Sequence, residues 1–292
     1  MKIITFDIEE WYIEKSFYGD RKERYQVYDR YLKSVLDLLD ERKIKATFFC
    51  VGELAKHFPR VVRIIASKGH EIGCHSNTHM WLSNMDCRSM YTDTLNAISA
   101  LENVCGQKVV SYRAPAFSIG EQNMWAFEVL AECGIERDAS IYPAVRDFGG
   151  FSSFPTDVPC IIKVNGFSLK EFPICMTKVF GKEFAYSGGG YFRFFPLSFI
   201  KSEMKKSDYS MAYFHIGDLE QRKMVLLNKE LFEQYYKIPA TLNNRIFRMI
   251  KSCLGTKGAF NKMINLVNSF DFVNVAEADS IINWSDTKVI DL

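Results

Sequence analysis

The segment Lys2-Ile3-Ile4-Thr5-Phe6-Asp7 begins the pattern that decides the fold. Its β-branched and aromatic residues predict a short buried strand, and residues 29–43 then place apolar side chains at helical spacing. The alternation continues through the first half of the chain, where we expect strands at 46–51, 71–75, 108–113 and 138–142 and helices at 60–68, 87–104 and 121–133. Strands that alternate with helices predict a parallel sheet covered by helices, either an open doubly wound sheet or a barrel.

The second half of the chain has a weaker pattern. Between 143 and 195, glycines, prolines and aromatic residues mix without a clear period, which predicts elaborated loops lying over the sheet. The later elements are expected to be a helix at 196–206, a strand at 211–215, helices within 227–267 and a last strand at 270–275. Since no internal repeat or low-complexity linker divides the chain, residues 1–292 are interpreted as one α/β domain.

The composition is that of an ordinary globular protein. The 292 residues are 48% hydrophobic and 25% charged, which is enough apolar material for a large core. The net charge of +2 is too small to indicate nucleic acid as a main partner. No apolar run approaches the roughly 20 residues that span a bilayer, so no transmembrane segment is expected.

The N-terminal residues and the cysteines indicate a compartment. The chain reaches the carboxylate of Asp7 within seven positions, so its start does not resemble a signal peptide. The eight cysteines are scattered without a CxxC pair. We therefore expect reduced cysteines and a cytoplasmic location.

Two carboxylates follow the first expected strand. Because side chains alternate along a strand, Asp7 and Glu9 are expected to project to the same face. The carboxyl end of a strand is where α/β folds place their active sites. Taken alone, this segment is equally compatible with a solvated acidic turn.

A pair of histidines follows the strand expected at 71–75. If the chain turns helical there, His75 and His79 lie on one helix face, at a spacing that lets two imidazoles share a divalent metal. Two imidazoles and one carboxylate suit Zn²⁺ or a similar ion. The spacing also arises by chance, and His57 and His70 are expected to cap a helix or to face solvent.

Two more expected strands end in residues that can do chemistry. Arg113 is able to hold a carboxylate, and the backbone after Pro115 is able to aim an N–H group inward. His215 ends a late apolar strand. Taken singly, these residues are read as a surface salt bridge and a structural histidine, but their joint occurrence with the carboxylates and the histidine pair is much less expected by chance.

In this order the motifs resemble those of the polysaccharide deacetylase family, the NodB-homology carbohydrate esterases. The segments that carry the resemblance are Thr5-Phe6-Asp7 with Glu9, His75-Ser76-Asn77-Thr78-His79, Arg113-Ala114-Pro115, Asp138 in Asp138-Ala139-Ser140-Ile141-Tyr142-Pro143, and Phe214-His215. The resemblance implies a distorted (β/α) barrel with fewer than eight regular strands. Further segments, including Ser187–Arg193, are similar to a subgroup associated with bacterial exopolysaccharide and surface-polysaccharide genes.

The first motif departs from the usual family pattern. The family commonly has two adjacent aspartates, whereas Ile8 follows Asp7 here. Strand alternation allows Glu9 to reach the metal instead, and Glu10 is the alternative ligand if the strand ends early. The departure leaves metal affinity open, and a non-catalytic carbohydrate-binding relative is a competing interpretation.

The resemblance implies a metal-dependent N-deacetylase. One divalent ion, expected to be Zn²⁺, is held by Glu9, His75 and His79, and it activates a water and polarises the acetyl carbonyl. Asp7, held by Arg113, takes the water proton.

The same resemblance assigns the oxyanion and the leaving group. The oxyanion is stabilised by the metal and by a backbone N–H after Pro115, at Ala116. His215 protonates the leaving amine, and Asp138 orients His215.

The implied substrate is an acetylated amino sugar in a bacterial polysaccharide or its precursor. Aromatic residues beside the motifs are candidates for stacking on the sugar, chiefly Trp11, Trp81 and Tyr191, with Tyr12 and Phe192 as further candidates. A metal amidohydrolase acting on a small non-sugar amide is the alternative enzyme. Aromatic side chains lining an open groove would favour the sugar, and a small closed polar pocket would favour the other amide.

Residues 237–270 contain six basic residues and no acidic one. Arg245, Arg248 and Lys251 lie at helical spacing, which favours a solvated helix face. Peripheral contact with a membrane, or guidance of an anionic or lipid-linked glycan, is the alternative interpretation. The sequence does not predict an oligomeric state.

Overall fold

A mainly parallel sheet forms the centre of the protein. The computed structural model describes residues 1–146, 149–236 and 238–292. Within these residues the main sheet has ten strands. They are β1 (Lys2–Ile8), β2 (Thr47–Cys50), β3 (Glu71–Cys74), β4 (Ser111–Tyr112), β5 (Arg137–Asp138), β6 (Cys160–Val164), β7 (Phe167–Glu171), β10 (Ser210–His215), β11 (Phe272–Val273) and β12 (Lys288–Asp291).

The strand order brings the functional strand ends to one edge. The order is β10-β1-β2-β3-β4-β5-β7-β6-β12, and β11 pairs with β1. All neighbours from β10 to β7 pair in parallel, whereas β6 and β7 are antiparallel. The register aligns Asp7 with His215. Residues from opposite halves of the chain therefore meet at the carboxyl end of β1.

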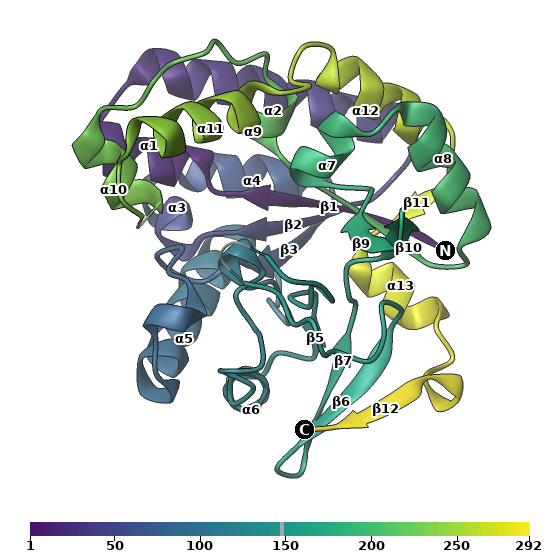
Figure 1. Cartoon of the computed structure of the whole chain (residues 1–292). Coiled ribbons are helices and arrows are strands. Elements are labelled where there is room, and N and C mark those ends of the chain that lie inside the picture. Colours follow the sequence, from purple (N-terminus) through teal and green to yellow (C-terminus); the bar gives the residue numbers. More distant parts are fainter. Residues whose placement is uncertain (147–148, 237) are drawn as a thin grey trace.

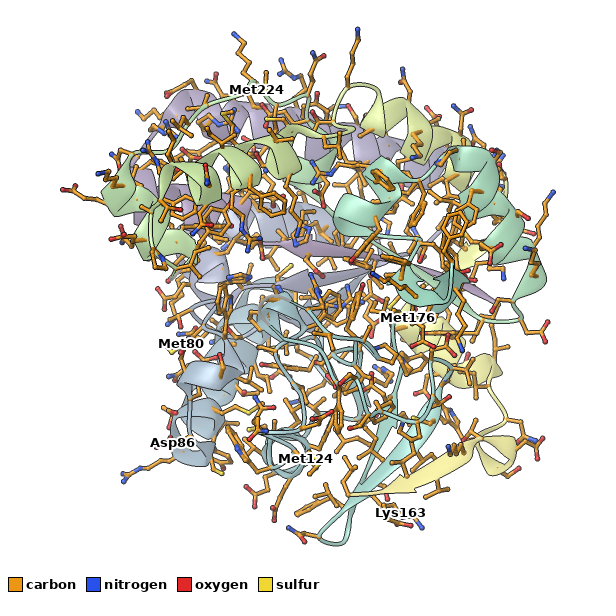
Figure 2. The ribbon with its side chains drawn as sticks, in the orientation of Figure 1. Met80, Asp86, Met124, Lys163, Met176 and Met224 are labelled. Carbon is orange, nitrogen blue, oxygen red and sulfur yellow. The ribbon has the colours of Figure 1, made fainter. Side chains whose placement is uncertain are left out.

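Helices surround this sheet, as expected for parallel strands whose two faces are buried. They are α1 (Glu10–Tyr18), α2 (Lys22–Glu41), α3 (Gly52–His57), α4 (Pro59–Ser67), α5 (Cys87–Cys105), α6 (Ala126–Glu132), α7 (Gly189–Phe194), α8 (Leu197–Lys206), α9 (Ile216–Leu219), α10 (Lys229–Tyr236), α11 (Leu242–Cys253), α12 (Ala259–Val267) and α13 (Val275–Ile281). In Figure 1, α2, α11 and α12 lie above β1, and β6, β7 and β12 lie at the lower end of the sheet. Side chains fill the space between these layers (Figure 2).

The predicted strand–helix alternation of the first half is confirmed, with most boundaries within one residue and larger differences at α2, β4, α6 and β5. The helix that begins at Glu10 was not predicted. It starts directly after Glu9, so the acidic segment bends from strand into helix at the edge of the sheet.

The prediction of elaborated loops between 143 and 195 is wrong for much of that segment. It contains the β6–β7 hairpin, a second hairpin made of β8 (Met176–Val179) and β9 (Lys182–Ala185), and α7. Both hairpins have two-residue turns, Asn165-Gly166 and Phe180-Gly181, in which all four residues have positive φ. Such turns match the twist of the paired strands.

The fold is the predicted distorted α/β barrel, whose hydrogen-bonded ladder does not close within the described residues. The side between β5 and β10 is filled by the segment around β8 and β9. Ile174 donates its backbone N–H to Ile141 O at 2.8 Å, and Ser187 Oγ donates to Met211 O at 2.6 Å. Gly188 forms an isolated parallel bridge with Tyr213. The barrel interior is thus enclosed without a complete ring of strands.

Candidate metal and catalytic site

Three side chains from neighbouring strand ends form a candidate metal site. Glu9 Oε2 lies 2.5 Å from His79 Nε2 and 3.5 Å from His75 Nε2. The three ligand atoms are within 4.8 Å of one another. One carboxylate oxygen and two imidazole nitrogens are a donor set that suits Zn²⁺ and related divalent ions.

The histidine pair does not lie on a helix, so that part of the prediction is wrong. β3 ends at Cys74, and Ser76 and His79 adopt left-handed φ values of 59° and 57°. Asp93, on α5, accepts hydrogen bonds from Asn77 N at 2.7 Å and from Thr78 Oγ1 at 3.3 Å. These bonds hold the turn, and the two imidazole centroids come within 5.2 Å.

The surroundings of these side chains fit a bound cation. His75 Nδ1 donates to the backbone oxygen of Arg113 at 2.7 Å, which leaves the lone pair of Nε2 facing Glu9. Glu9 Oε2 is buried and has no hydrogen-bond partner. Burial alone would raise the pKa of Glu9, but His79, His215 and His75 lower it well below its ordinary value. A buried anionic oxygen without a hydrogen-bond donor is a suitable metal ligand.

Glu10, the alternative ligand, points elsewhere. Its Oε1 accepts the backbone N–H of Gly217 at 2.5 Å. Desolvation raises the pKa of Glu10 to about 7, with the charge of Glu9 adding to the rise and His215 opposing it. The geometry therefore favours Glu9 over Glu10 as the third ligand.

Asp7 is held beside the candidate metal site by a buried arginine. Arg113 is fully buried, and its Nη1 donates to Asp7 Oδ1 and to Thr5 Oγ1, both at 2.8 Å. Its Nε donates to Ala139 O at 3.1 Å, which fixes the plane of the guanidinium. The second oxygen of Asp7 lies 3.9 Å from His215 Nε2. Asp7 therefore presents one oxygen to Arg113 and the other to His215, which lines the cavity.

His215 faces the same carboxylates from the other half of the chain. Its Nε2 lies 3.7 Å from Glu9 Oε1, and its Nδ1 lies 2.9 Å from Asp218 Oδ2. Desolvation would lower the pKa of His215, but Glu9, Asp218 and Asp7 raise it to about 10. Arg193 Nε is 3.5 Å from Asp218 Oδ1, so Asp218 is itself held by a cation.

The prediction that Asp138 orients His215 is wrong. Asp138 is fully buried, and Ser140 Oγ donates to its Oδ1 at 2.6 Å. Its other neighbour is Glu171, which accepts the Ile141 N–H at 3.1 Å. Burial raises the pKa of both carboxyls, and their mutual proximity raises that of Glu171 further. Asp138 thus lies at the end of β5, next to Ala139, whose backbone oxygen accepts the hydrogen bond from Arg113. The carboxylate that contacts His215 is Asp218.

A cavity of about 1000 Å³ opens over these groups. Glu9, His79 and His215 line it, as do Ala116 and Trp81 from the predicted set. Its remaining walls include the aromatic residues Tyr12, Phe17, Tyr235 and Tyr236 and the cationic residues Arg146, Arg193, Arg222, Arg248 and Lys251. Ala116 has a left-handed φ of 54°, which is rare for a residue with a side chain and which places its backbone in the cavity wall.

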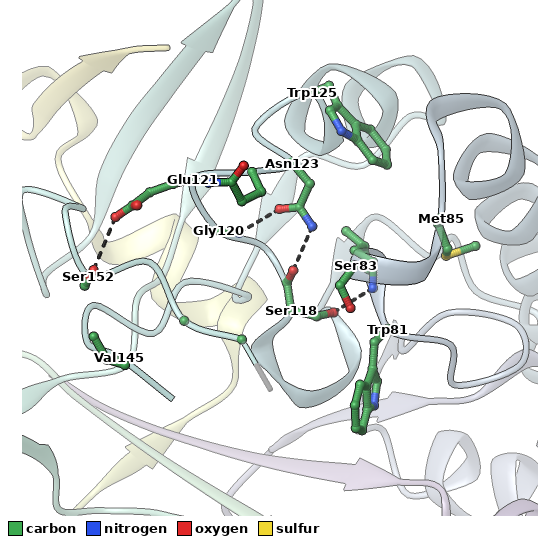
Figure 3. A pocket seen from close by; sticks show the side chains of 14 residues that line it. Trp81, Ser83, Met85, Ser118, Gly120, Glu121, Asn123, Trp125, Val145 and Ser152 are labelled. Atoms are coloured by element: carbon green, nitrogen blue, oxygen red, sulfur yellow. Dashed lines mark hydrogen bonds between the residues drawn. The ribbon is translucent and has the colours of Figure 1, made fainter. Parts of the chain in front are cut away.

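Trp81 also lines a second cavity of about 660 Å³, shown in Figure 3. There Ser118 Oγ accepts the Leu82 N–H at 3.0 Å, and Asn123 Nδ2 donates to Ser118 O at 2.9 Å. These bonds fix the turn that carries Trp81. Trp81 therefore belongs to the walls of both cavities, of which the first also contains Glu9 and His79.

The predicted substrate contacts Trp11, Tyr191 and Pro115 do not line the main cavity, and neither does the further candidate Phe192, which is fully buried. Trp11 is fully buried, its Nε1 donates to Asp29 Oδ1 at 3.0 Å, and its ring packs edge-on against Tyr28. The prediction for Trp11 is therefore wrong. Tyr191 packs with Phe184 and Phe195, and Pro115 is buried behind Ala116.

The sequence interpretation missed three residues of the site. Arg193 and Tyr235 line the cavity, and Asp218 contacts His215 and Arg193. For Asp218 a signal was present, because a carboxylate three residues after a strand-end histidine caps the following turn. Arg193 and Tyr235 come from helices far along the chain, so no spacing pattern connects them with His215.

Comparison with known proteins divides the chain at the end of β5. Residues 4–137 match the family model described as polysaccharide deacetylase, and residues 139–279 match a domain of unknown function, DUF3473. The two matched regions contribute strands to the same sheet.

Curated relatives match about a third of the chain. A chitooligosaccharide deacetylase from Sinorhizobium fredii is 35% identical over 97 residues, which are 33% of this chain and 42% of the relative. A peptidoglycan-N-acetylglucosamine deacetylase from Bacillus cereus is 34% identical over 95 residues, 32% of this chain and 34% of the relative. The matches thus span less than half the length of these relatives.

Solved structures show the same fold over the whole chain. A protein from Mycobacterium smegmatis, assigned as a polysaccharide deacetylase, aligns with a TM-score of 0.65 and 19% identity, covering 100% of this chain and 92% of that one. A 4-alpha-glucanotransferase from Thermococcus litoralis aligns with a TM-score of 0.62 and 13% identity, covering 100% of this chain and 41% of that one.

Proposed function

Since the chain belongs to the polysaccharide deacetylase family through residues 4–137, we propose that it hydrolyses the N-acetyl group of an acetylated amino sugar. The substrate is a bacterial polysaccharide or its precursor. The observation that carries this proposal is that the side chains of Glu9, His75, His79, Asp7 and His215 lie together, and that Glu9, His79 and His215 line one cavity.

Glu9, His75 and His79 would hold a divalent ion, for which we propose Zn²⁺ because the donors are two imidazoles and one carboxylate. When bound, such an ion supplies a Lewis acid that polarises the acetyl carbonyl and makes water more acidic. The Arg113 carbonyl keeps the His75 ring in the tautomer that presents Nε2.

Asp7 acts as the general base. Its Oδ1 is held by Arg113, while Oδ2 is turned toward His215 and is the oxygen that can accept a proton from the attacking water. The buried guanidinium keeps the carboxylate in place when the proton is transferred. The backbone N–H of Ala116, in the cavity wall, is the proposed donor to the oxyanion.

His215 acts as the general acid. An amide nitrogen leaves poorly unless it is protonated, so the reaction needs a proton donor on the side opposite the base. The Asp218 contact holds the imidazole and favours its charged form. We assign Asp218 the positioning role that the sequence assigned to Asp138.

The cavity supports a sugar rather than a small amide as substrate. Its volume of about 1000 Å³ is at the upper end of ordinary ligand sites. Trp81 and Tyr12 offer aromatic surfaces beside the ligand set, and the second cavity continues beyond Trp81. The cationic residues of the wall further favour a saccharide that carries negative charge.

The free cysteines support a cytoplasmic location as part of the proposal. All eight are free thiols, and burial raises the pKa of Cys50 and Cys74 well above the usual range, which keeps these two unreactive.

The test combines metal analysis with acetate release. Purified protein, stripped with a chelator and reloaded with Zn²⁺, should bind about one ion per chain and release acetate from oligomers of N-acetylglucosamine. Release from a small amide such as acetanilide, with none from the oligomers, would favour the alternative amidohydrolase. Metal binding without release from any acetylated saccharide would favour a binding protein.

A further inference from the structure

α11 is an amphipathic helix whose apolar face is turned outward. Its solvent-facing side carries four large apolar residues, Leu242, Ile246, Phe247 and Ile250, and the C-cap residue Leu254 extends this stripe. Phe247 is 60% exposed and Ile250 is 50% exposed. No residue of this helix is buried. A helix of a globular protein ordinarily turns such a stripe toward the core.

The side of α11 that faces the protein is polar. Arg248, Lys251 and Ser252 line the main cavity. Arg245 donates through Nε to Leu227 O at 2.8 Å. The helix therefore forms part of the cavity rim with its charged side and leaves its apolar side uncovered.

A neighbouring segment extends the exposed apolar surface. Residues 224–226 are Met, Val and Leu, and all are exposed, Met224 by 70%. The segment runs beside α11, because Arg245 binds Leu227 O and the Cys253 thiol donates to Lys223 O at 3.5 Å. Met224 marks this edge of the molecule in Figure 2, where α11 lies in Figure 1. We call α11 and residues 224–226 the apolar rim.

Basic residues accompany the apolar rim. Lys223, Lys251 and Lys257 are exposed, and residues 238–270 contain no acidic residue. The acidic residues Glu230 and Glu233 belong to the preceding helix, α10. The sequence interpretation of a solvated helix face is therefore incomplete, since the most exposed side of α11 is apolar and its flanks are basic.

We propose that the apolar rim docks the protein on a membrane that contains anionic lipids. Exposed apolar side chains bordered by cations fit the boundary between acyl chains and anionic headgroups. A second copy of the chain fits less well, because a symmetric contact would bring the basic residues beside one apolar rim close to those beside the other. α11 has 12 residues, about 18 Å in length, so it lies on the surface rather than crossing about 30 Å of hydrocarbon.

Docking in this way places the mouth of the cavity at the membrane surface. Arg248 and Lys251 of α11 line the same cavity as Glu9 and His79. A saccharide attached to a lipid would then reach the cavity past these two cations.

The test is co-sedimentation of the full chain with vesicles. The protein should bind vesicles made of equal parts phosphatidylcholine and phosphatidylglycerol, and it should bind less to phosphatidylcholine alone or at high salt. Phe247→Asp with Ile250→Asp should reduce binding to the anionic vesicles by at least about tenfold, because two apolar side chains no longer enter the membrane. Ile281→Asp, which changes an exposed isoleucine on α13, is the matched control and should bind like the unchanged protein.

Met224→Asp with Val225→Asp gives an independent test in an irregular segment, where no helix has to tolerate the substitution. The proposal is overturned if the unchanged protein does not bind anionic vesicles, or if both double variants bind as well as it does. It is also overturned if sedimentation shows a dimer that dissociates in the double variants, since a second copy would then cover the apolar rim.

Discussion

The two halves of the chain contribute different chemistry to one cavity. Residues before 138 provide Glu9, His75 and His79, with Asp7 and Arg113 behind them. These side chains are mostly buried and fixed by hydrogen bonds. Residues after 138 provide His215, whose side chain is 30% exposed, and most of the cationic wall.

The two halves also match different family models. The first region matches the polysaccharide deacetylase family model, and it supplies the candidate metal ligands and the proposed base. The second region matches a domain of unknown function, and it supplies the proposed acid, the cations of the wall and the apolar rim. We infer that the first half holds the metal and the base, and that the second half supplies the acid and the surfaces that select the substrate and its location.

The largest effect should follow from removing the ligands of the first half. His75→Ala with His79→Ala should abolish most metal binding and lower acetate release by at least about 10³-fold, because metal catalysis supplies several kcal/mol. His57→Ala is the control, since His57 is exposed and lies beside Glu53 on α3. Full metal content in the double variant would contradict the assigned site.

The next effect tests the base separately from the ligands. Asp7→Asn should lower turnover by roughly 10²-fold or more because the proton acceptor is lost. The amide can still accept the hydrogen bond from Arg113, so metal content should stay at the level of the unchanged protein. Unchanged turnover would exclude Asp7 as the base.

A smaller effect is expected at the positioning residue of the second half. The proposed acid works in its protonated form, and Asp218 helps to raise the pKa of His215 to about 10. Asp218→Asn should lower the pKa of His215, so kcat should begin to fall at a lower pH than in the unchanged protein. On this alkaline limb we expect kcat to be about tenfold below that of the unchanged protein. Asp138→Asn is the matched control and should leave this alkaline limb in place. If the alkaline limb shifted in the Asp138 variant and not in the Asp218 variant, Asp138 would be the residue that orients His215, as the sequence analysis predicted.

The smallest effect concerns stability where the two halves join. Burial raises the pKa of Glu171 well above the ordinary value, so the folded protein holds a proton that the unfolded chain releases. The resulting stability is present at low pH and is lost as the pH rises through the folded-state pKa. While only the folded protein holds this proton, stability falls by about 1.4 kcal/mol per pH unit. Glu171→Gln cannot hold the proton, so its Tm should fall less than that of the unchanged protein as the pH is raised through the neutral and mildly alkaline range. A Tm with the same pH dependence as that of the unchanged protein would contradict the assignment of a bound proton to Glu171.

The sequence predicted the first half of the site better than the second because strand alternation is a local rule. The carboxylates of Asp7 and Glu9 do lie near one another, at 3.9 Å and 3.7 Å from His215 Nε2, although Glu9 comes one residue after the end of β1. His75 and His79 converge without the expected helix, because hydrogen bonds from α5 hold an irregular turn. Nothing in the local sequence indicates that tertiary support.

The errors in the second half have separate causes. The dipeptide Asn165-Gly166 is a strong hairpin signal that was overlooked between the short strands of that region. Trp11 was assigned to substrate from its position beside a motif, but α1 turns its indole into the core. Arg193 and Tyr235 reach the cavity from helices whose placement only the folded chain defines.

The division of labour between the halves is tested most directly in the His215→Ala protein loaded with metal. The measurement is the ratio of N-acetyl hydrolysis on a sugar oligomer to hydrolysis of an activated acetyl ester, whose leaving group needs little protonation. We predict full metal content and a fall in amide hydrolysis that exceeds the fall in ester hydrolysis by at least about tenfold. Equal losses in both reactions, or loss of the metal, would contradict the assignment of the acid to the second half of the chain.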